Sequence, residues 1–107
     1  MIEERRKETL ASGKRKYNKG LIDQAIEHYE EALQDDDLIS DMIFKARLQV
    51  DFSRKLIELE LFQKAQDLLE EAEQELGEID MTDEGQTVAF WKIRYSLGKL
   101  YFRSMYQ

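Results

Sequence analysis

Residues 22–34 have the sequence IDQAIEHYEEALQ, and this stretch sets the fold class of the chain. Its apolar side chains recur at steps of three and four residues: Ile22, Ala25, Ile26, Tyr29, Ala32 and Leu33. Because an α-helix makes one turn in about 3.6 residues, this spacing gathers the apolar side chains on one face. The stretch is therefore predicted to be an amphipathic helix with a polar outer face.

The same pattern returns 40 residues later, where residues 62–74 have the sequence FQKAQDLLEEAEQ. At this shift, residues of like kind coincide at five positions: Ile22 with Phe62, Ala25 with Ala65, Tyr29 with Leu69, Ala32 with Ala72, and Gly13 with Ser53. A second shift, of 45 residues, places Gly98 at the position of Ser53. Self-similarity at a fixed spacing is the signature of a repeat architecture.

Five helices and no strand are predicted, so the expected fold class is all-α. The helices cover about residues 2–18, 22–34, 41–59, 62–76 and 86–106, and Ser40 or Asp41 is the expected N-cap of the third. The acidic triplet at 35–37 is expected to end the second helix, and Gly77 the fourth. The chain contains no proline, and its 107 residues suit a single domain, residues 1–107.

The composition excludes several classes of functional site. Without cysteine there is no disulfide framework, thiolate metal site or cysteine nucleophile. His28 is the only histidine, so a metal site with several histidine ligands cannot be built, and its expected place on an exposed helix face disfavours a serine–histidine–aspartate triad. No apolar run is long enough to cross a membrane, and the first residues do not resemble a secretion signal. We expect a cytoplasmic protein that is not an enzyme, with no catalytic residue, no metal and no cofactor.

Three segments match a known repeat motif. Leu97-Gly98-Lys99-Leu100-Tyr101 matches the L-G-x2-Y element of the tetratricopeptide repeat in full, and residues 52–56 are a conservative version of it. Ala25-x3-Tyr29 and Ala65-x3-Leu69 match the element of the second helix, and residues 18–22 are similar to the family's turn. The chain thus resembles the tetratricopeptide repeat family, as about two and a half degenerate repeats.

The resemblance implies antiparallel helical hairpins stacked as a short right-handed superhelix. Repeat 1 would cover about residues 5–38, repeat 2 about 42–80, and a third first helix or cap about 86–107. The first helix of each hairpin would line a concave groove, and the second would form the convex back. The small residues at the repeated positions are expected where helices approach closely: Gly13, Ser53, Gly98, Ala25 and Ala65.

Charge is segregated along the chain in step with these helices. The net charges are +4 for residues 1–20, −7 for 21–37, 0 for 38–60, −6 for 61–80 and +4 for 85–107. If the chain follows the family, its groove is positive and its back is negative. The overall net charge of −7 makes nucleic acid an unfavourable partner.

Basic residues occupy six equivalent positions on the first helices, and we name this set the basic ladder: Lys7, Lys14, Arg47, Arg54, Lys92 and Lys99. Three of them follow the repeated small residue, and the other three stand seven residues earlier, about two turns away on the same face. Tyr17, Ile57 and Phe102 lie three residues beyond and are expected as apolar anchors of the groove. The alternative is that these cations merely solvate exposed helix faces.

One branch of the family grips a partner's C-terminal carboxylate with two lysines, two asparagines and an arginine. Lys92 fits that clamp, but Leu10, Lys14, Asp51 and Ser96 stand where lysine, asparagine, asparagine and arginine are expected. Chaperone-tail binding is therefore not predicted. A basic groove still suits an acidic peptide, extended or helical.

The last predicted helix carries ten large apolar side chains distributed all round it, and such a helix is usually buried on several sides. Either the chain is part of a longer repeat array, or a second copy or partner covers this surface. The residues expected to self-associate are Trp91, Tyr95, Tyr101, Met105 and Tyr106.

The sequence thus leads to one main hypothesis and two alternatives. The main one is a protein–protein interaction module, a scaffold or adaptor that binds an acidic peptide or protein segment in its basic concave groove. The first alternative is an oligomerisation segment, for example of a homodimer, that uses the aromatic last helix. The second, which the acidic back disfavours, is binding of RNA or single-stranded nucleic acid.

Overall fold

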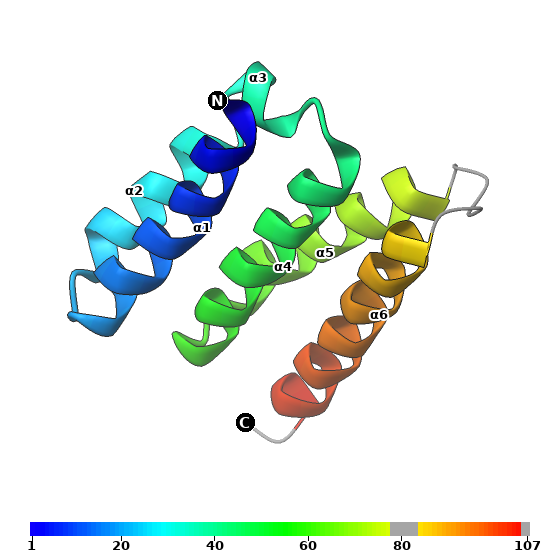
Figure 1. Ribbon diagram of the computed structural model, residues 1–107. Coiled ribbons are helices and arrows are strands. Elements are labelled where there is room, and N and C mark those ends of the chain that lie inside the picture. Colours follow the sequence, from blue (N-terminus) through cyan, green and yellow to red (C-terminus); the bar gives the residue numbers. More distant parts are fainter. Residues whose placement is uncertain (78–83, 106–107) are drawn as a thin grey trace.

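The computed structural model describes residues 1–77 and 84–105, and within them every regular element is an α-helix (Figure 1). The helices are α1 (Ile2–Asn18), α2 (Ile22–Ala32), α3 (Asp36–Ile39), α4 (Met42–Glu58), α5 (Phe62–Gly77) and α6 (Glu84–Met105). The all-α prediction is confirmed, and the five predicted helices are all present. The predicted number is wrong by one, because the described part of the chain contains a sixth, short helix.

The extra helix, α3, lies where the acidic triplet was expected only to end the second helix. The Asp35 side chain accepts hydrogen bonds from the backbone N–H groups of Asp37 at 3.1 Å and Leu38 at 3.3 Å, so it caps a new turn. Asp41 caps α4 in the same way, with the N–H groups of Ile43 at 3.0 Å and Phe44 at 3.2 Å. Short acidic side chains thus begin two helices within seven residues.

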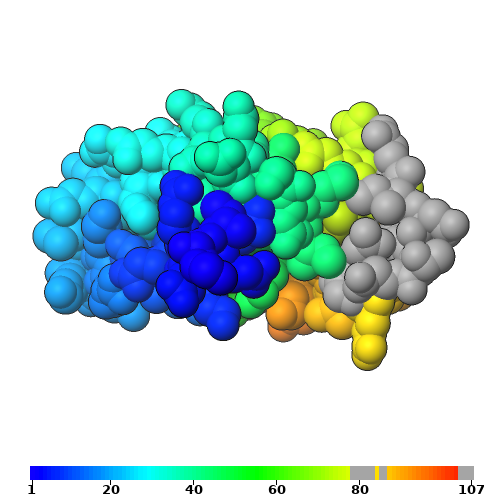
Figure 2. Space-filling view, turned by 45° about the horizontal axis from the view of Figure 1, so that its top comes forward, coloured from blue at the N-terminus to red at the C-terminus, as the bar shows by residue number. Residues whose placement is uncertain are grey.

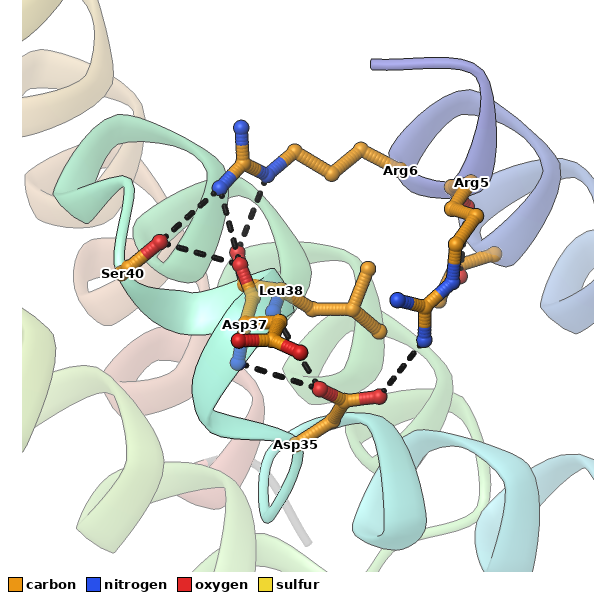
Figure 3. A network of polar contacts seen from close by, with 7 residues as sticks. Arg5, Arg6, Asp35, Asp37, Leu38 and Ser40 are labelled. Carbon is orange, nitrogen blue, oxygen red and sulfur yellow. Dashed lines mark hydrogen bonds and ion pairs between the residues drawn. The ribbon is translucent and has the colours of Figure 1, made fainter. Parts of the chain in front are cut away.

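The N-terminal turn of α1 packs against α3 (Figure 2). Arg6 donates hydrogen bonds to the backbone carbonyls of Leu38 and Asp37, both at 3.0 Å, and to the Ser40 hydroxyl at 3.1 Å (Figure 3). Arg5 adds an ion pair with Asp35 at 2.8 Å. The carbonyls at the end of α3, which have no partner within the helix, are therefore satisfied by a guanidinium group.

The helices form two antiparallel hairpins, α1/α2 and α4/α5, followed by α6 (Figure 1). Helices α1, α4 and α6 lie side by side and run in the same direction, while α2 and α5 lie behind them (Figure 1). Helix α4 is central, because it packs against α1, α2, α3, α5 and α6. This arrangement brings the three basic or neutral helices onto one side of the molecule and the two acidic helices onto the other.

The two hairpin turns have the same hydrogen-bond pattern, 40 residues apart. After α1, the N–H of Leu21 bonds to the carbonyl of Lys16, and the N–H of Gly20 bonds to that of Tyr17, both at 3.0 Å. After α4, the N–H groups of residues 61 and 60 bond to the carbonyls of residues 56 and 57 at 2.9 and 3.0 Å. Both turns are Schellman motifs, and both need a left-handed residue, which is Gly20 at φ 80° and Glu60 at φ 63°.

Glu60→Gly is expected to raise the free energy of unfolding by about 0.5–1 kcal/mol, because glycine adopts the left-handed conformation without a Cβ clash. Gly20→Glu, the reciprocal change at the equivalent turn, is expected to lower it by about 1 kcal/mol. Urea denaturation of both variants beside the natural chain measures the two effects. Changes of the same sign in the two variants would contradict the equivalence of the turns.

The small residues at the repeated positions do not all serve close packing. Ala25, Ser53 and Ala65 are buried, as expected. A Cβ on Gly13 would lie 2.6 Å from Cζ of Tyr29, so α1 and α2 meet there without room for a side chain. Gly98 is different: it is exposed, and a Cβ there would meet nothing within 4 Å. The close approach predicted at Gly98 is therefore wrong within the described chain.

Candidate functional site

A pocket of about 330 Å³ opens between α1, α4 and α6. Five of the six residues of the basic ladder line it: Lys14 from α1, Arg47 and Arg54 from α4, and Lys92 and Lys99 from α6. Lys7 is exposed on α1 but does not line this pocket. A smaller cavity of about 90 Å³ adjoins it, and Arg54 and Lys99 line both.

The convergence follows from the register of three helices that run in the same direction (Figure 1). Lys14, Arg54 and Lys99 occupy the same position in the repeat, so they project at similar heights from neighbouring helices. Arg47 and Lys92 lie two turns earlier on their helices and extend the charge along the pocket. Five of the six residues that the repeat spacing and the family resemblance grouped together thus line one pocket, and Lys7 does not.

The six cations of the basic ladder all lack an acidic partner among the described residues, whereas most of the other basic side chains have one. Among the described residues, none of its six side chains is within ion-pair distance of an acid, whereas seven of the other ten basic side chains make ion pairs: Arg5, Arg6, Arg15, Lys45, Lys55, Lys64 and Arg94. The acidic side chains that could neutralise the ladder lie mainly on α2 and α5, on the opposite side (Figure 1). A cleft lined by charges of one sign concentrates the field and attracts ligands of the other sign.

The pocket contains one acidic residue, Asp51, and that carboxylate is already engaged. It accepts a hydrogen bond from the Tyr29 hydroxyl at 2.5 Å and makes an ion pair with Lys55 at 2.8 Å. Its side chain is only 13% exposed. Lys55 thus balances the charge of Asp51, and the excess positive charge of the ladder remains available to a ligand.

The pocket walls also supply apolar surface. Leu10, Ala46, Val50 and Ala89 line the pocket beside the ladder. Trp91 and Tyr95 form its α6 side and stay 64% and 70% exposed. Lys99 Nζ lies 5.7 Å from the centroid of the Tyr95 ring, a cation–π distance. Cations and aromatic rings therefore share one surface.

The predicted apolar anchors are only partly where they were expected. Ile57 is 4% exposed and belongs to the core, and it lines the smaller cavity instead of the larger pocket. Tyr17 is half-buried, and its hydroxyl donates to Glu58 at 2.7 Å. Phe102 is 65% exposed on α6 but lines neither cavity.

The residues expected to self-associate also differ in their surroundings. Trp91 and Tyr95 are exposed, so both rings are accessible to a partner. The Tyr101 hydroxyl turns towards α5 and donates to Glu70 at 3.4 Å. The side chain of Met105 and the whole of Tyr106 lie outside the described residues. His28, expected on an exposed face, is half-buried, and its Nε2 lies 2.9 Å from the Thr9 carbonyl of α1.

Sequence reasoning missed several lining residues that a simple signal could have found. Leu10, Val50 and Ser96 each stand three or four residues from a ladder position, and side chains at that spacing share a helix face. Arg103 stands four residues after Lys99 and lines the smaller cavity for the same reason. No signal in the sequence indicated that Asp51 would be bound to Tyr29 across the hairpins.

Two tyrosines make the stability of this region sensitive to alkaline pH. The hydrogen bond to Glu58, then burial and the charge of Glu58, raise the pKa of Tyr17 to about 12 from the ordinary value of 10. Burial, then the hydrogen bond to Asp51 and its charge, raise the pKa of Tyr29 strongly. The folded chain therefore keeps both phenolic protons at a pH where the unfolded chain loses them.

The stabilisation from these raised pKa values is complete below pH 10 and is expected to decrease as the pH rises above 10; the part due to Tyr17 is lost by about pH 12, and the part due to Tyr29 continues to decrease beyond it. Urea denaturation at a series of pH values measures this loss. Tyr29→Phe should flatten the dependence, because phenylalanine has no proton to lose. Equal slopes for the variant and the natural chain would contradict the assignment.

No protein-family model, curated protein or solved structure matches this chain. None of the helices within residues 1–77 and 84–105 has the length and apolar character needed to span a bilayer. Within the same residues, no cluster of three or more His, Cys, Asp and Glu side chains is placed to hold a metal ion.

Proposed function

We propose that this chain is a protein-interaction module that binds an acidic peptide or protein segment on the face formed by α1, α4 and α6. The observation that carries the proposal is the basic ladder: the fold leaves its six cations without acidic partners in the described chain, and five of them line one pocket. Binding rather than catalysis is the role proposed for this surface.

The proposal includes a tetratricopeptide-like architecture, in which α1, α4 and α6 are the first helices of successive repeats. Three observations support it: the two hairpins, their matching turns 40 residues apart, and the shared direction of the three first helices. A fourth is the position of the residues aligned with the family's carboxylate clamp, since all five line the pocket: Leu10, Lys14, Asp51, Lys92 and Ser96. The residue types differ from the clamp, so the ligand proposed is an acidic segment and not a chain terminus. A cytoplasmic location remains part of this proposal.

Selection from a displayed library of random peptides tests the ligand class. The expected result is enrichment of aspartate and glutamate together with aromatic or aliphatic residues, because the ladder and the Trp91–Tyr95 wall would contact the same peptide. Selection is repeated on Lys14→Glu/Arg54→Glu, which we name the groove variant. Peptides without an acidic bias, or equal retention by the groove variant, would overturn the proposal.

A further inference from the structure

Helix α6 has two apolar faces, and among the described residues one of them is buried while the other remains largely exposed. Its inner face is buried against α4 and α5 and consists of Ala89, Ile93, Leu97 and Leu100. On the opposite side, Val88, Trp91, Tyr95 and Phe102 are 47%, 64%, 70% and 65% exposed. With Gly98 these residues follow one another at steps of three and four, and we name them the outer stripe. Helices with such a stripe ordinarily pack it against another helix.

The glycine of the outer stripe has a filled counterpart elsewhere in the molecule. Gly98 occupies the repeat position of Gly13, since both align with Ser53. At Gly13 the ring of Tyr29, from the acidic helix α2, fills the space that a side chain would occupy. At Gly98 the same space is open. The structure therefore shows in its first hairpin how a helix of this kind is covered, and leaves the equivalent position of α6 uncovered.

Charge selects the kind of helix that can cover the outer stripe. The stripe is flanked by Lys92 and Lys99 on the pocket side and by Arg94 towards α5, and α6 has no acidic residue after Glu84. Two copies of α6 placed face to face would bring these cations together, which disfavours a symmetric dimer. An acidic helix is complementary, as in the first hairpin, where α2 and the residues that flank it carry −7 and residues 1–20 carry +4.

We propose that the outer stripe docks an acidic amphipathic helix from a partner protein, with an aromatic side chain of that helix seated over Gly98. This surface adjoins the proposed peptide groove and shares Trp91 and Tyr95 with it, but Val88, Gly98 and Phe102 lie outside the groove. The partner helix resembles α2 in chemistry: acidic on its outer face, with a small residue four positions before the aromatic one, as in Ala25-x3-Tyr29.

A synthetic peptide of residues 21–37 supplies such a helix. Its binding is followed through the fluorescence of Trp91, the only tryptophan of the chain. The titration uses the groove variant as the host, so that the peptide cannot bind through an intact basic ladder. The expected result is a saturable blue shift of the Trp91 emission. Gly98→Ala in the same host should weaken binding at least about tenfold, and so should replacing the tyrosine of the peptide by alanine.

The outcomes separate this proposal from the proposed function. Absence of a blue shift, or a shift that Gly98→Ala leaves unchanged, would overturn docking at the outer stripe whatever the groove binds. Sedimentation of the full chain alone provides the second arm. A dimer that Gly98→Ala dissociates would show that a second copy, and not an acidic partner helix, covers the stripe, and would overturn the proposal as stated.

Discussion

Gly13→Ala is expected to lower the free energy of unfolding by about 2 kcal/mol, whereas Gly98→Ala is expected to raise it by up to about 1 kcal/mol. The added Cβ at position 13 would lie 2.6 Å from Cζ and 2.7 Å from the hydroxyl oxygen of Tyr29. That ring cannot easily move, because its centroid lies 5.0 Å from that of the stacked Phe52 ring and its hydroxyl donates a hydrogen bond to Asp51. The alanine side chain at this position would therefore clash with the ring of Tyr29, which the core holds in place.

Gly98 is the matched control, because it has the same repeat position and the same helical backbone. Nothing within 4 Å would meet its Cβ, so alanine there only removes the flexibility that glycine gives the unfolded chain. Urea denaturation followed by far-ultraviolet circular dichroism measures both variants. A loss of stability in Gly98→Ala as large as that in Gly13→Ala would show that α6 is covered by something the described chain does not contain.

The contrast between these glycines shows what the sequence could and could not establish. The periodic apolar residues predicted the bounds of α2 and α5 to within two residues. This was possible because the apolar face of a helix depends only on the spacing of residues along the local sequence. The small residue at each repeat position was also visible. Whether a second helix fills the space above it depends on a tertiary partner, which exists for Gly13 and is missing for Gly98.

Two further differences between expectation and structure have similar physical causes. The acidic triplet at 35–37 indicated the end of a helix, but an aspartate such as Asp35 can equally cap the start of one. Whether a new helix forms there depends on a tertiary contact, the hydrogen bonds from Arg6 to the carbonyls at the end of α3. Ile57 stands three residues from Arg54, which turns it about 60° from the ladder and under α6. By contrast, five residues of the ladder line one pocket because they occupy equivalent positions on neighbouring helices that run in the same direction; Lys7, near the start of α1, is the exception.

The second large effect is expected in binding. The groove variant, Lys14→Glu/Arg54→Glu, should weaken the affinity for an acidic peptide about 100-fold, because two attractive contacts in a shared pocket become repulsive. The stability of the fold should change little, since neither side chain makes an ion pair within the described residues. Raising the salt concentration should weaken the binding of the natural chain more than that of the variant.

The matched control is Lys16→Glu/Lys19→Glu, near the end of α1. It changes the net charge of the chain by the same amount, and neither residue lines a cavity between the helices. Long-range attraction of an acidic ligand by the whole molecule would be weakened equally in the two variants. The two variants would differ in affinity only if the ligand binds at the pocket itself.

The most direct measurement is therefore a calorimetric titration of one acidic peptide, enriched in the display selection, into the natural chain, the groove variant and the control variant. The account predicts that the natural chain and the control bind with affinities within about threefold of each other, while the groove variant binds about 100-fold more weakly. Equal affinities for the groove variant and the control would contradict it, because the basic ladder would then act only as a solvated surface.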